Sequence, residues 1–368
     1  MSKCALCGSD ASPVASVLGI CGPCLREDED AAREAGEKSR RAVRERTDGR
    51  PAPSGEGEKA VRCRVCAQRC VLAPGEAGLC GLRENEDGRL KRTGGPPGAA
   101  RLDSYFDPHP TNCVGAWICP AHTGCGHPAF ARTPGPERGY KNLSVFYRAC
   151  NLDCLFCRNW YFRLPGGRYA SPEELAEEVD EATSCICYFG GDPGPHLPHA
   201  IKASRLALDE ARKHDRALRI CFETNGLIGS ELLPAVMDLV VDSGGLLKFD
   251  LKAFSGNVHR ALTGSSNRVV LDNFRKAASM IRRRPDPPPL MASTLLVPGY
   301  VDRAEVESVA RFIASVDPTI PYSLLAFHPD FLLADLPPTS KEEAREALDV
   351  ARRAGLTRLH VGNIFLDA

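Results

Sequence analysis

The second half of the chain alternates short apolar runs with longer amphipathic stretches. The apolar runs are rich in Leu, Val, Ile and Phe, as expected for strands that are buried on both faces. The stretches between them repeat apolar residues every three or four positions, which predicts helices with one buried face. We expect strands at residues 143–147, 185–189, 218–222, 246–251, 290–297 and 322–327.

Amphipathic helices are expected between these strands. The first of them opens with Ser171 as N-cap, Pro172 at the first helical position and Glu174 in the capping-box position. Repeated strand–helix alternation implies a parallel sheet. The expected helices cover residues 171–181, 201–214, 230–238, 271–284, 304–315 and 340–354.

The number of units bounds the architecture, because six strand–helix units are too few for a closed eightfold barrel. The pattern predicts an α/β fold, an open partial (β/α)6 TIM-like barrel over residues 141–368, with a Cys-rich N-terminal metal-binding extension. In such a fold the chemistry belongs at the carboxyl ends of the strands.

The part before residue 141 divides into three segments by composition. Residues 1–26 have the cysteine spacing of a zinc-ribbon-like module, and residues 61–140 form a Cys-rich segment. Residues 27–60 are dense in both charge signs and end in Pro and Gly, which predicts a solvated helix that fades into a charged linker.

Charge and hydropathy exclude some partners. The 368 residues carry 47 basic and 47 acidic side chains, so no global field draws the protein to nucleic acid, and a local patch would be needed. The basic stretch 38–46 is the candidate, although such runs are more often a wet helix face. No run reaches the ~20 apolar residues of a membrane span, and the sequence starts without a secretory signal. We expect a cytoplasmic protein.

Cysteine is the anomaly of the composition, with 17 residues. Without a secretory signal, closely spaced thiols indicate metal binding rather than disulfides. Two CxxC pairs in the first 26 residues suit the tetrahedral four-sulfur shell of structural Zn²⁺. Metal binding would then supply the folding energy of a module too small to bury a core. The four residues are Cys4, Cys7, Cys21 and Cys24.

Two further cysteine groups precede the barrel. The first consists of Cys63, Cys66, Cys70 and Cys80, whose spacings suit either Zn²⁺ or an iron–sulfur cluster. The second consists of Cys113, Cys119 and Cys125 in a Gly-, Pro- and His-rich segment. We expect this segment near the barrel mouth, holding an auxiliary iron–sulfur cluster or serving as a lid with incidental thiols.

The cysteine run after the first strand carries the chemistry. Cys150, Cys154 and Cys157 stand at x3 and x2 spacing. Three thiolates supply three ligands to a four-iron cubane, so one iron stays open to a ligand that the protein does not provide. A further zinc knuckle is the alternative, but the position at the end of a barrel strand disfavours it.

This CxxxCxxC run, with the aromatic Phe156 before its last cysteine, resembles the radical SAM superfamily. The resemblance implies a [4Fe-4S] cluster on the three cysteines. The open iron would chelate S-adenosyl-L-methionine (SAM), which the reduced cluster cleaves to a 5′-deoxyadenosyl radical. Phe156 takes the place of the aromatic that packs near adenine.

The residues at the ends of other strands resemble sequence motifs of the same superfamily, and of its glycyl-radical (pyruvate-formate-lyase) activating-enzyme branch. Gly190, Gly191, Asp192 and Pro193 are similar to a GGEP motif that receives the SAM amino group. Glu223 and Thr224 are similar to a DTNG station, and Asp250 and Lys252 to a DLK station. The resemblance places Lys252 near the SAM carboxylate, and Glu223 and Asp250 in the pocket around a small cation. The fifth strand reads Ala292-Ser293-Thr294 where that branch carries an Arg.

A nearer resemblance is to the AmmeMemoRadiSam system radical-SAM enzyme. It rests on residues 63–85, the run 157–160 and the closing residues 361–363, and together with the strand-end stations it covers roughly residue 62 to the end. It covers neither residues 1–60 nor Cys113, Cys119 and Cys125.

These observations predict a radical-SAM oxidoreductase that abstracts hydrogen from a protein or small-molecule substrate. An electron donor such as flavodoxin or ferredoxin would reduce its cluster. The alternative is a radical-SAM enzyme that modifies RNA and uses the zinc module as a clamp. The chain has no basic patch interleaved with aromatics that would stack bases, so we do not expect a nucleic-acid partner. A metal-binding adaptor with a purely structural cluster leaves the strand-end stations unexplained.

Overall fold

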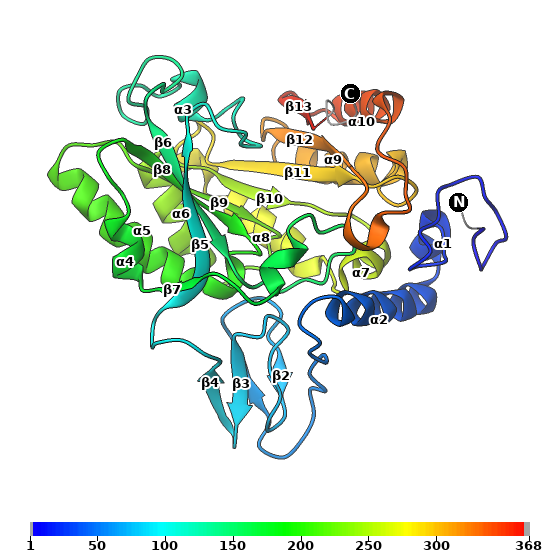
Figure 1. Cartoon of the computed structure of the whole chain (residues 1–368). Helices are drawn as coiled ribbons and strands as arrows, with labels where there is room; N and C mark the ends of the chain where they lie inside the picture. The colour runs from blue at the N-terminus through cyan, green and yellow to red at the C-terminus, as the bar shows by residue number, and fades with distance from the viewer. Residues whose placement is uncertain (1–2, 364–368) are drawn as a thin grey trace.

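The computed structural model describes residues 3–363, and in them one mixed sheet of nine strands forms the centre of the molecule (Figure 1). Its strand order is β13-β12-β11-β10-β9-β8-β6-β5-β7, and the run from β6 to β13 is parallel. In the described residues β13 and β7 are the two free edges, so the barrel is open. The parallel strands are β6 (Lys141–Tyr147), β8 (Thr183–Gly190), β9 (Arg219–Thr224), β10 (Leu247–Asp250), β11 (Leu290–Leu296), β12 (Tyr322–Ala326) and β13 (Leu359–Gly362).

The six predicted strands are confirmed, and three further strands extend the sheet. β13 adds a seventh parallel strand at one edge. At the other edge β5 (Ala100–Pro108) runs antiparallel to β6, and β7 (Arg168–Ala170) runs antiparallel to β5. β5 is polar and half exposed, with Asp103 and Asp107 among its residues. An edge strand does not need the continuous apolar pattern of a buried one.

The helices between the parallel strands are also confirmed, with shifted ends. The predicted capping box is present, since Ser171 accepts a hydrogen bond from the Glu174 amide while the Glu174 carboxylate accepts one from the Ser171 amide. One further helix, α7 (Gly256–Thr263), was missed. The others are α4 (Pro172–Glu177), α5 (Leu197–Lys213), α6 (Leu233–Ser243), α8 (Arg268–Ala278), α9 (Arg303–Val316) and α10 (Lys341–Arg353).

The amino-terminal segment contains the helix that its charge pattern predicts, but one face of this helix is buried against the barrel. Helix α1 (Gly22–Glu27) leads into α2 (Glu29–Glu45), which packs along α7. The buried face of α2 contains Ala32 and Ala35, and the Ser39 hydroxyl donates to the Ala261 carbonyl at 2.7 Å. Small residues bring the two helices close together, so the helix has a buried stripe although few of its residues are large and apolar.

The Cys-rich segment folds into two small hairpins below the sheet in Figure 1. β1 (Val61–Arg62) pairs with β2 (Val71–Leu72), and β3 (Arg83–Glu86) pairs with β4 (Arg89–Arg92).

Residues 109–140 then connect β5 to β6 and contain the short helix α3 (Pro120–Thr123). Because Pro108 pairs with Lys141, this connection starts and ends at the amino-terminal edge of the parallel strands. The domain boundaries drawn from the sequence stay predictions. No helix in the described part of the chain is long and apolar enough to cross a membrane.

Candidate active site

The cysteine loop leaves the carboxyl end of β6, where the sequence predicts it. Its backbone is fixed on one side by α7, because the amides of Asp153 and Leu155 donate to the carbonyls of Thr263 and Leu262, both at 3.0 Å. Cys154 is buried and Cys150 and Cys157 are partly buried. The loop therefore presents three sulfur atoms from a backbone that tertiary contacts hold in place.

A cavity of about 270 Å³ opens beside these thiols at the carboxyl ends of the strands. It contains every barrel residue that the sequence selected except Pro193, which lies just beyond it. Lys248, Ser293 and Asn225 also line it, and none of these three was selected. The selected residues in its lining are Cys150, Cys154, Phe156, Cys157, Gly190, Gly191, Asp192, Glu223, Thr224, Asp250 and Lys252.

Asp192 lies at the back of this cavity and receives a ring of hydrogen bonds. The amides of Gly194 and Asn225 donate to it at 2.7 Å, and the Thr224 hydroxyl donates at 3.1 Å. Burial raises the pKa of Asp192 to about 6, although these donors act in the opposite direction. The carboxyl is thus positioned rigidly, and its charge is set by its surroundings.

The two positions before Asp192 require glycine for packing, in addition to the predicted approach of a ligand to their backbone. Gly190 has a φ of 96°, and a Cβ there would lie 2.6 Å from the Phe146 Cα. A Cβ on Gly191 would lie 2.2 Å from the Ala149 carbonyl oxygen. Side chains at these positions would collide with the backbone that leads into the cysteine loop. The glycines therefore let β8 turn directly against the cysteine loop.

A row of charged groups crosses the cavity from β9 to β10. Lys248 Nζ lies 2.8 Å from a Glu223 carboxylate oxygen and 3.0 Å from an Asp250 carboxylate oxygen. Burial lowers the pKa of Lys248, but the charges of Asp250 and Glu223 outweigh this and leave the pKa above its ordinary value. The resemblance implies a small cation around Glu223 and Asp250, and the Lys248 ammonium lies within 3.0 Å of both carboxylates.

Asp250 has two further partners. The Ser293 hydroxyl donates to it at 2.8 Å from the fifth barrel strand, at the position where the resemblance indicates an Arg. Lys252 Nζ lies 3.5 Å from Asp250 and 5.5 Å from the centre of the Phe156 ring. Lys252 thus stands between the cysteine loop and the carboxylates of the cavity.

The thiols of the loop match a site that binds a metal cluster. Burial, followed by the charge of Asp192, raises the pKa of Cys150 to about 12. Burial likewise raises the pKa of Cys154 and Cys157. The metal-free thiols are therefore protonated at neutral pH, and metal ligation is what would hold them as thiolates. Three thiols around an open cavity fit a cluster with one iron left free.

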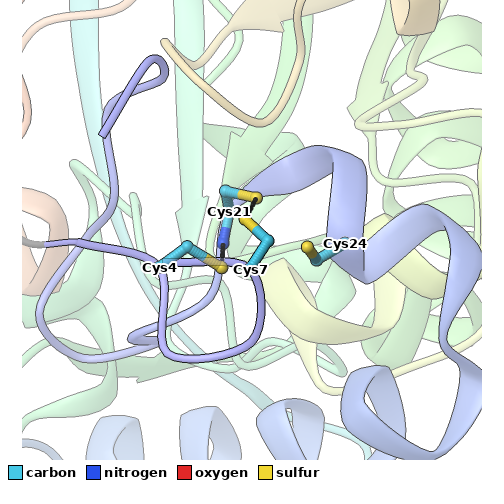
Figure 2. A group of neighbouring side chains, drawn as sticks. All are labelled: Cys4, Cys7, Cys21 and Cys24. Atoms are coloured by element: carbon cyan, nitrogen blue, oxygen red, sulfur yellow. Dashed lines mark hydrogen bonds between the residues drawn. The ribbon is translucent and has the colours of Figure 1, made fainter. Parts of the chain in front are cut away.

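The four amino-terminal cysteines converge as the sequence predicts (Figure 2). Cys4, Cys7, Cys21 and Cys24 place all four sulfurs within 4.8 Å of one another. The sulfurs of Cys7 and Cys21 are 3.9 Å apart, close to the ~3.8 Å edge of a tetrahedron with Zn–S bonds of about 2.3 Å.

Backbone amides support this group. Burial opposes a negative charge on Cys4, but backbone N–H groups of Cys7, Cys21 and Leu6 outweigh this and lower the pKa of Cys4 to about 6. The geometry and the donor set fit one tetrahedral metal ion.

The module that carries these cysteines is docked on the barrel. The Tyr300 hydroxyl donates to the Ile20 carbonyl at 3.0 Å and accepts from the Ala15 amide at 2.9 Å. Arg26 binds Asp302 with two hydrogen bonds, at 2.7 and 3.2 Å. The module is therefore a fixed part of the surface rather than a free ribbon.

The second cysteine set lies against the barrel beside the cavity. Cys66 forms a β-bridge with Ile228, and the Gln68 side chain donates to the Asn151 carbonyl at 2.6 Å. In residues 3–363 its thiols do not form a group within 4.8 Å, so they are not gathered as tightly as around one zinc ion. Either zinc or an iron–sulfur cluster stays the prediction for this set, which consists of Cys63, Cys66, Cys70 and Cys80.

The third cysteine group does not act as one set. The loop that carries it starts and ends at the amino-terminal edge of the parallel strands, and Cys113 reaches a residue that lines the cavity. Cys113 lies 3.9 Å from Glu223, whereas Cys125 lies 3.3 Å from Asp286, before the start of β11. A fully buried ion pair anchors the loop, since Glu137 binds Arg219 at 2.6 Å. The geometry does not support an auxiliary cluster on Cys113, Cys119 and Cys125.

The open parallel barrel and the three-thiol loop at its mouth define a class of enzyme. Residues 144–313 match the model of the Radical SAM superfamily, so this chain carries a radical SAM domain. That domain makes the protein an enzyme of radical chemistry and implies a [4Fe-4S] cluster and SAM.

Relatives at low identity extend the comparison. An uncharacterized protein of Methanocaldococcus jannaschii is 24% identical over 318 residues, which is 83% of this chain and 81% of that protein. The pyruvate formate-lyase-activating enzyme of Staphylococcus aureus is 23% identical over 197 residues, 50% of this chain and 73% of that enzyme.

Solved structures overlap only in part. A domain of the pyruvate-formate lyase-activating enzyme of Bacteroides vulgatus has a TM-score of 0.39 and 21% identity, and covers 48% of this chain and 98% of that one. SuiB of Streptococcus suis, bound to its precursor peptide SuiA, has a TM-score of 0.44 and 12% identity, and covers 58% and 46%. The nearer resemblance to the AmmeMemoRadiSam system enzyme stays a prediction.

Proposed function

We propose that Cys150, Cys154 and Cys157 hold the [4Fe-4S] cluster and that the adjoining cavity binds SAM for hydrogen abstraction from a substrate. The observation that carries this proposal is the cavity itself, which joins three thiols at one wall to carboxylates and lysines at the other. A cluster held by these three thiolates would supply the one electron that reductively cleaves a C–S bond of SAM in the adjoining cavity.

The residues of the cavity divide the binding of SAM between them. Asp192 accepts a hydrogen bond from the amino group of the methionyl moiety, in a position fixed by its three donors. Lys252 faces the methionyl carboxylate, and Phe156 packs against the adenine. Glu223, Lys248 and Asp250 form a charge row of two carboxylates and one ammonium, and Lys252 beside Asp250 brings its formal sum to zero.

The substrate that we favour is a residue of a protein or peptide, as in an activating enzyme. The supporting observation is the similarity to a protein named for activating pyruvate formate-lyase. An electron donor such as flavodoxin or ferredoxin would reduce the cluster.

The RNA-modifying alternative loses support from the contacts of α2. Arg40 and Arg44, two cations of the basic stretch, turn inward to Asp153. They are therefore occupied inside the protein and are not offered to phosphates.

The test is anaerobic reconstitution followed by reduction with dithionite and analysis of the products of SAM. The wild type is expected to form 5′-deoxyadenosine and methionine, and Cys154→Ala is expected to form neither. Cys125→Ala is the matched control, because this thiol faces Asp286 away from the cavity. Formation of S-adenosylhomocysteine alone, or an active Cys154→Ala variant, would overturn the assignment.

Zinc in the amino-terminal module is a second part of the proposal. Cys4, Cys7, Cys21 and Cys24 would hold one Zn²⁺ as a closed structural site. Its position on Tyr300 and Asp302 indicates a stabilising role at the outer surface of the barrel.

A further inference from the structure

A second cavity lies outside the barrel, between the β3–β4 hairpin and the start of α5. Its volume is about 260 Å³. Arg83, Arg92, Lys202, His196 and the first turn of α5 line it. This cavity shares no lining residue with the SAM cavity, and none of the metal-binding or SAM-binding residues selected from the sequence lines it.

Two arginines face each other in this cavity without an acidic partner. Arg83 and Arg92 are directly opposite in the register of the hairpin. Within residues 3–363 neither forms a salt bridge, and Arg83 reaches only the Pro195 carbonyl, at 3.5 Å. Like charges directly across a strand pair are destabilising. Burial, followed by the charge of Arg83, lowers the pKa of Arg92. An anion between the two guanidinium groups would remove this repulsion.

His196 supplies a second and independent indication of a ligand. Its side chain is 4% exposed and its Nε2 atom has no hydrogen-bond partner in the described chain. The ring is held by stacking on Tyr147, at 4.4 Å between centroids and 11° between planes. A buried polar atom without a partner costs free energy, so this nitrogen indicates a missing hydrogen-bonding group.

Helix α5 begins at the same place. It has 17 residues, its N-cap is His196, and no side chain caps its first turn. Pro198 in that turn has no amide hydrogen, so the helix contributes the positive end of its dipole, which no acidic residue of the first turn neutralises. The one carboxylate in the lining, Glu173, is bound by Lys202 at 2.6 Å.

We propose that this cavity binds the phosphoryl group of a small-molecule ligand. Two guanidinium groups and an imidazole offer donors to three oxygens, whereas a carboxylate has only two, and the positive end of the α5 dipole favours an anion. The volume suits a phosphoryl group with a few attached atoms rather than a large ligand. The site borders the segment that carries Asp192, because His196 lies four residues after that carboxylate and Arg83 binds Pro195 between them.

The experiment measures thermal stability and ³¹P NMR line width of the purified protein with inorganic phosphate, against chloride at the same ionic strength. Phosphate is expected to raise the Tm of the wild type and to broaden its own resonance. Arg92→Gln should weaken phosphate binding by about tenfold or more, since hydrogen bonds to charged groups are the stronger kind. Without phosphate this variant should be as stable as the wild type or more so, because the repulsion from Arg83 is gone.

The matched control is Arg89→Gln, an exposed arginine on the same strand that does not line the cavity. It should bind phosphate like the wild type. Arg83→Gln is the second cavity variant and should lose binding as Arg92→Gln does. Glycerol phosphate is tested beside inorganic phosphate. The probe that binds more tightly shows whether the ligand is a phosphate ester or the free ion. No effect of phosphate on the wild type, or equal losses in Arg89→Gln and Arg92→Gln, would overturn the proposal.

Discussion

Arg44 of α2 and Asp153 of the cysteine loop form a buried ion pair, with Arg44 Nη2 at 3.4 Å from the carboxylate of Asp153. The two side chains are 5% and 3% exposed. Arg163 adds a contact at 3.0 Å from the other oxygen of Asp153. Asp153 stands between Cys150 and Cys154, so a helix that the sequence predicted to be solvated holds the loop of the proposed cluster in place.

Arg44→Gln is therefore expected to loosen the cysteine loop. Arg163 stays beside Asp153 in this variant, so the loss should be smaller than the about 3–5 kcal/mol of a buried charge left unpaired. The variant should unfold at lower urea and retain less iron after reconstitution. Urea unfolding and iron content measure the two effects. Arg41→Gln, an exposed arginine of the same helix, is the control. Equal iron retention in the two variants would show that the pair does not support the loop.

Truncation separates the contribution of the amino-terminal module from that of the Arg40 and Arg44 contacts with Asp153. Removal of residues 1–26 should leave iron content near that of the wild type, because Arg40 and Arg44 remain. Removal of residues 1–55 should reduce it, contrary to what a flexible linker predicts. Iron and sulfide analysis of both reconstituted truncations gives the answer, and equal content in both would restore the linker interpretation.

Zinc content tests the amino-terminal site. The wild type should contain one zinc per chain in addition to iron, and Cys21→Ala should lose it because three sulfurs no longer close the tetrahedron. Elemental analysis of protein purified without added metal measures this. Cys125→Ala should keep the zinc. A Cys21→Ala variant that retains one zinc would place the metal at another cysteine set.

Lys248→Met tests the charge row of the cavity. It leaves Glu223 and Asp250 without the ammonium between them, and two neighbouring carboxylates disfavour each other's charge. SAM cleavage in choline chloride should fall by about tenfold or more, equivalent to about 1.4 kcal/mol, and potassium or sodium ions should restore part of it. Lys276→Met, an exposed lysine of α8, is the control. Loss that no cation relieves would show that Lys248 acts in another way.

Glu137→Gln tests the anchor of residues 109–140. Burial raises the pKa of Glu137, but the hydrogen bonds and charge of Arg219 outweigh this and leave it below the ordinary 4.5. The ionised carboxylate thus contributes stability that is present above about pH 4.5 and is lost as the pH falls through the lower value in the folded protein.

At pH 7 the Glu137→Gln variant should be about 3–5 kcal/mol less stable than the wild type, and its stability should fall less steeply below pH 4.5. Urea unfolding between pH 3 and pH 7 measures both. Parallel curves for the two proteins would contradict the role given to the pair.

The sequence alone determined the barrel and the place of its chemistry. Apolar runs predict parallel strands, and parallel strands end at one edge, so Cys150, Asp192, Glu223 and Asp250 had to meet there. The zinc group was equally local, since four thiols within the first 24 residues can converge through two tight turns.

Only the tertiary structure decided which charges meet inside the protein. Arg44 and Asp153 lie 109 positions apart, and Glu137 and Arg219 lie 82 apart. The packing also separated Cys113 from Cys125, which the spacing had grouped together. The reason is physical: strand and helix patterns depend on neighbours along the chain, whereas a buried charge pairs with whatever residue the packed fold brings within a few ångströms.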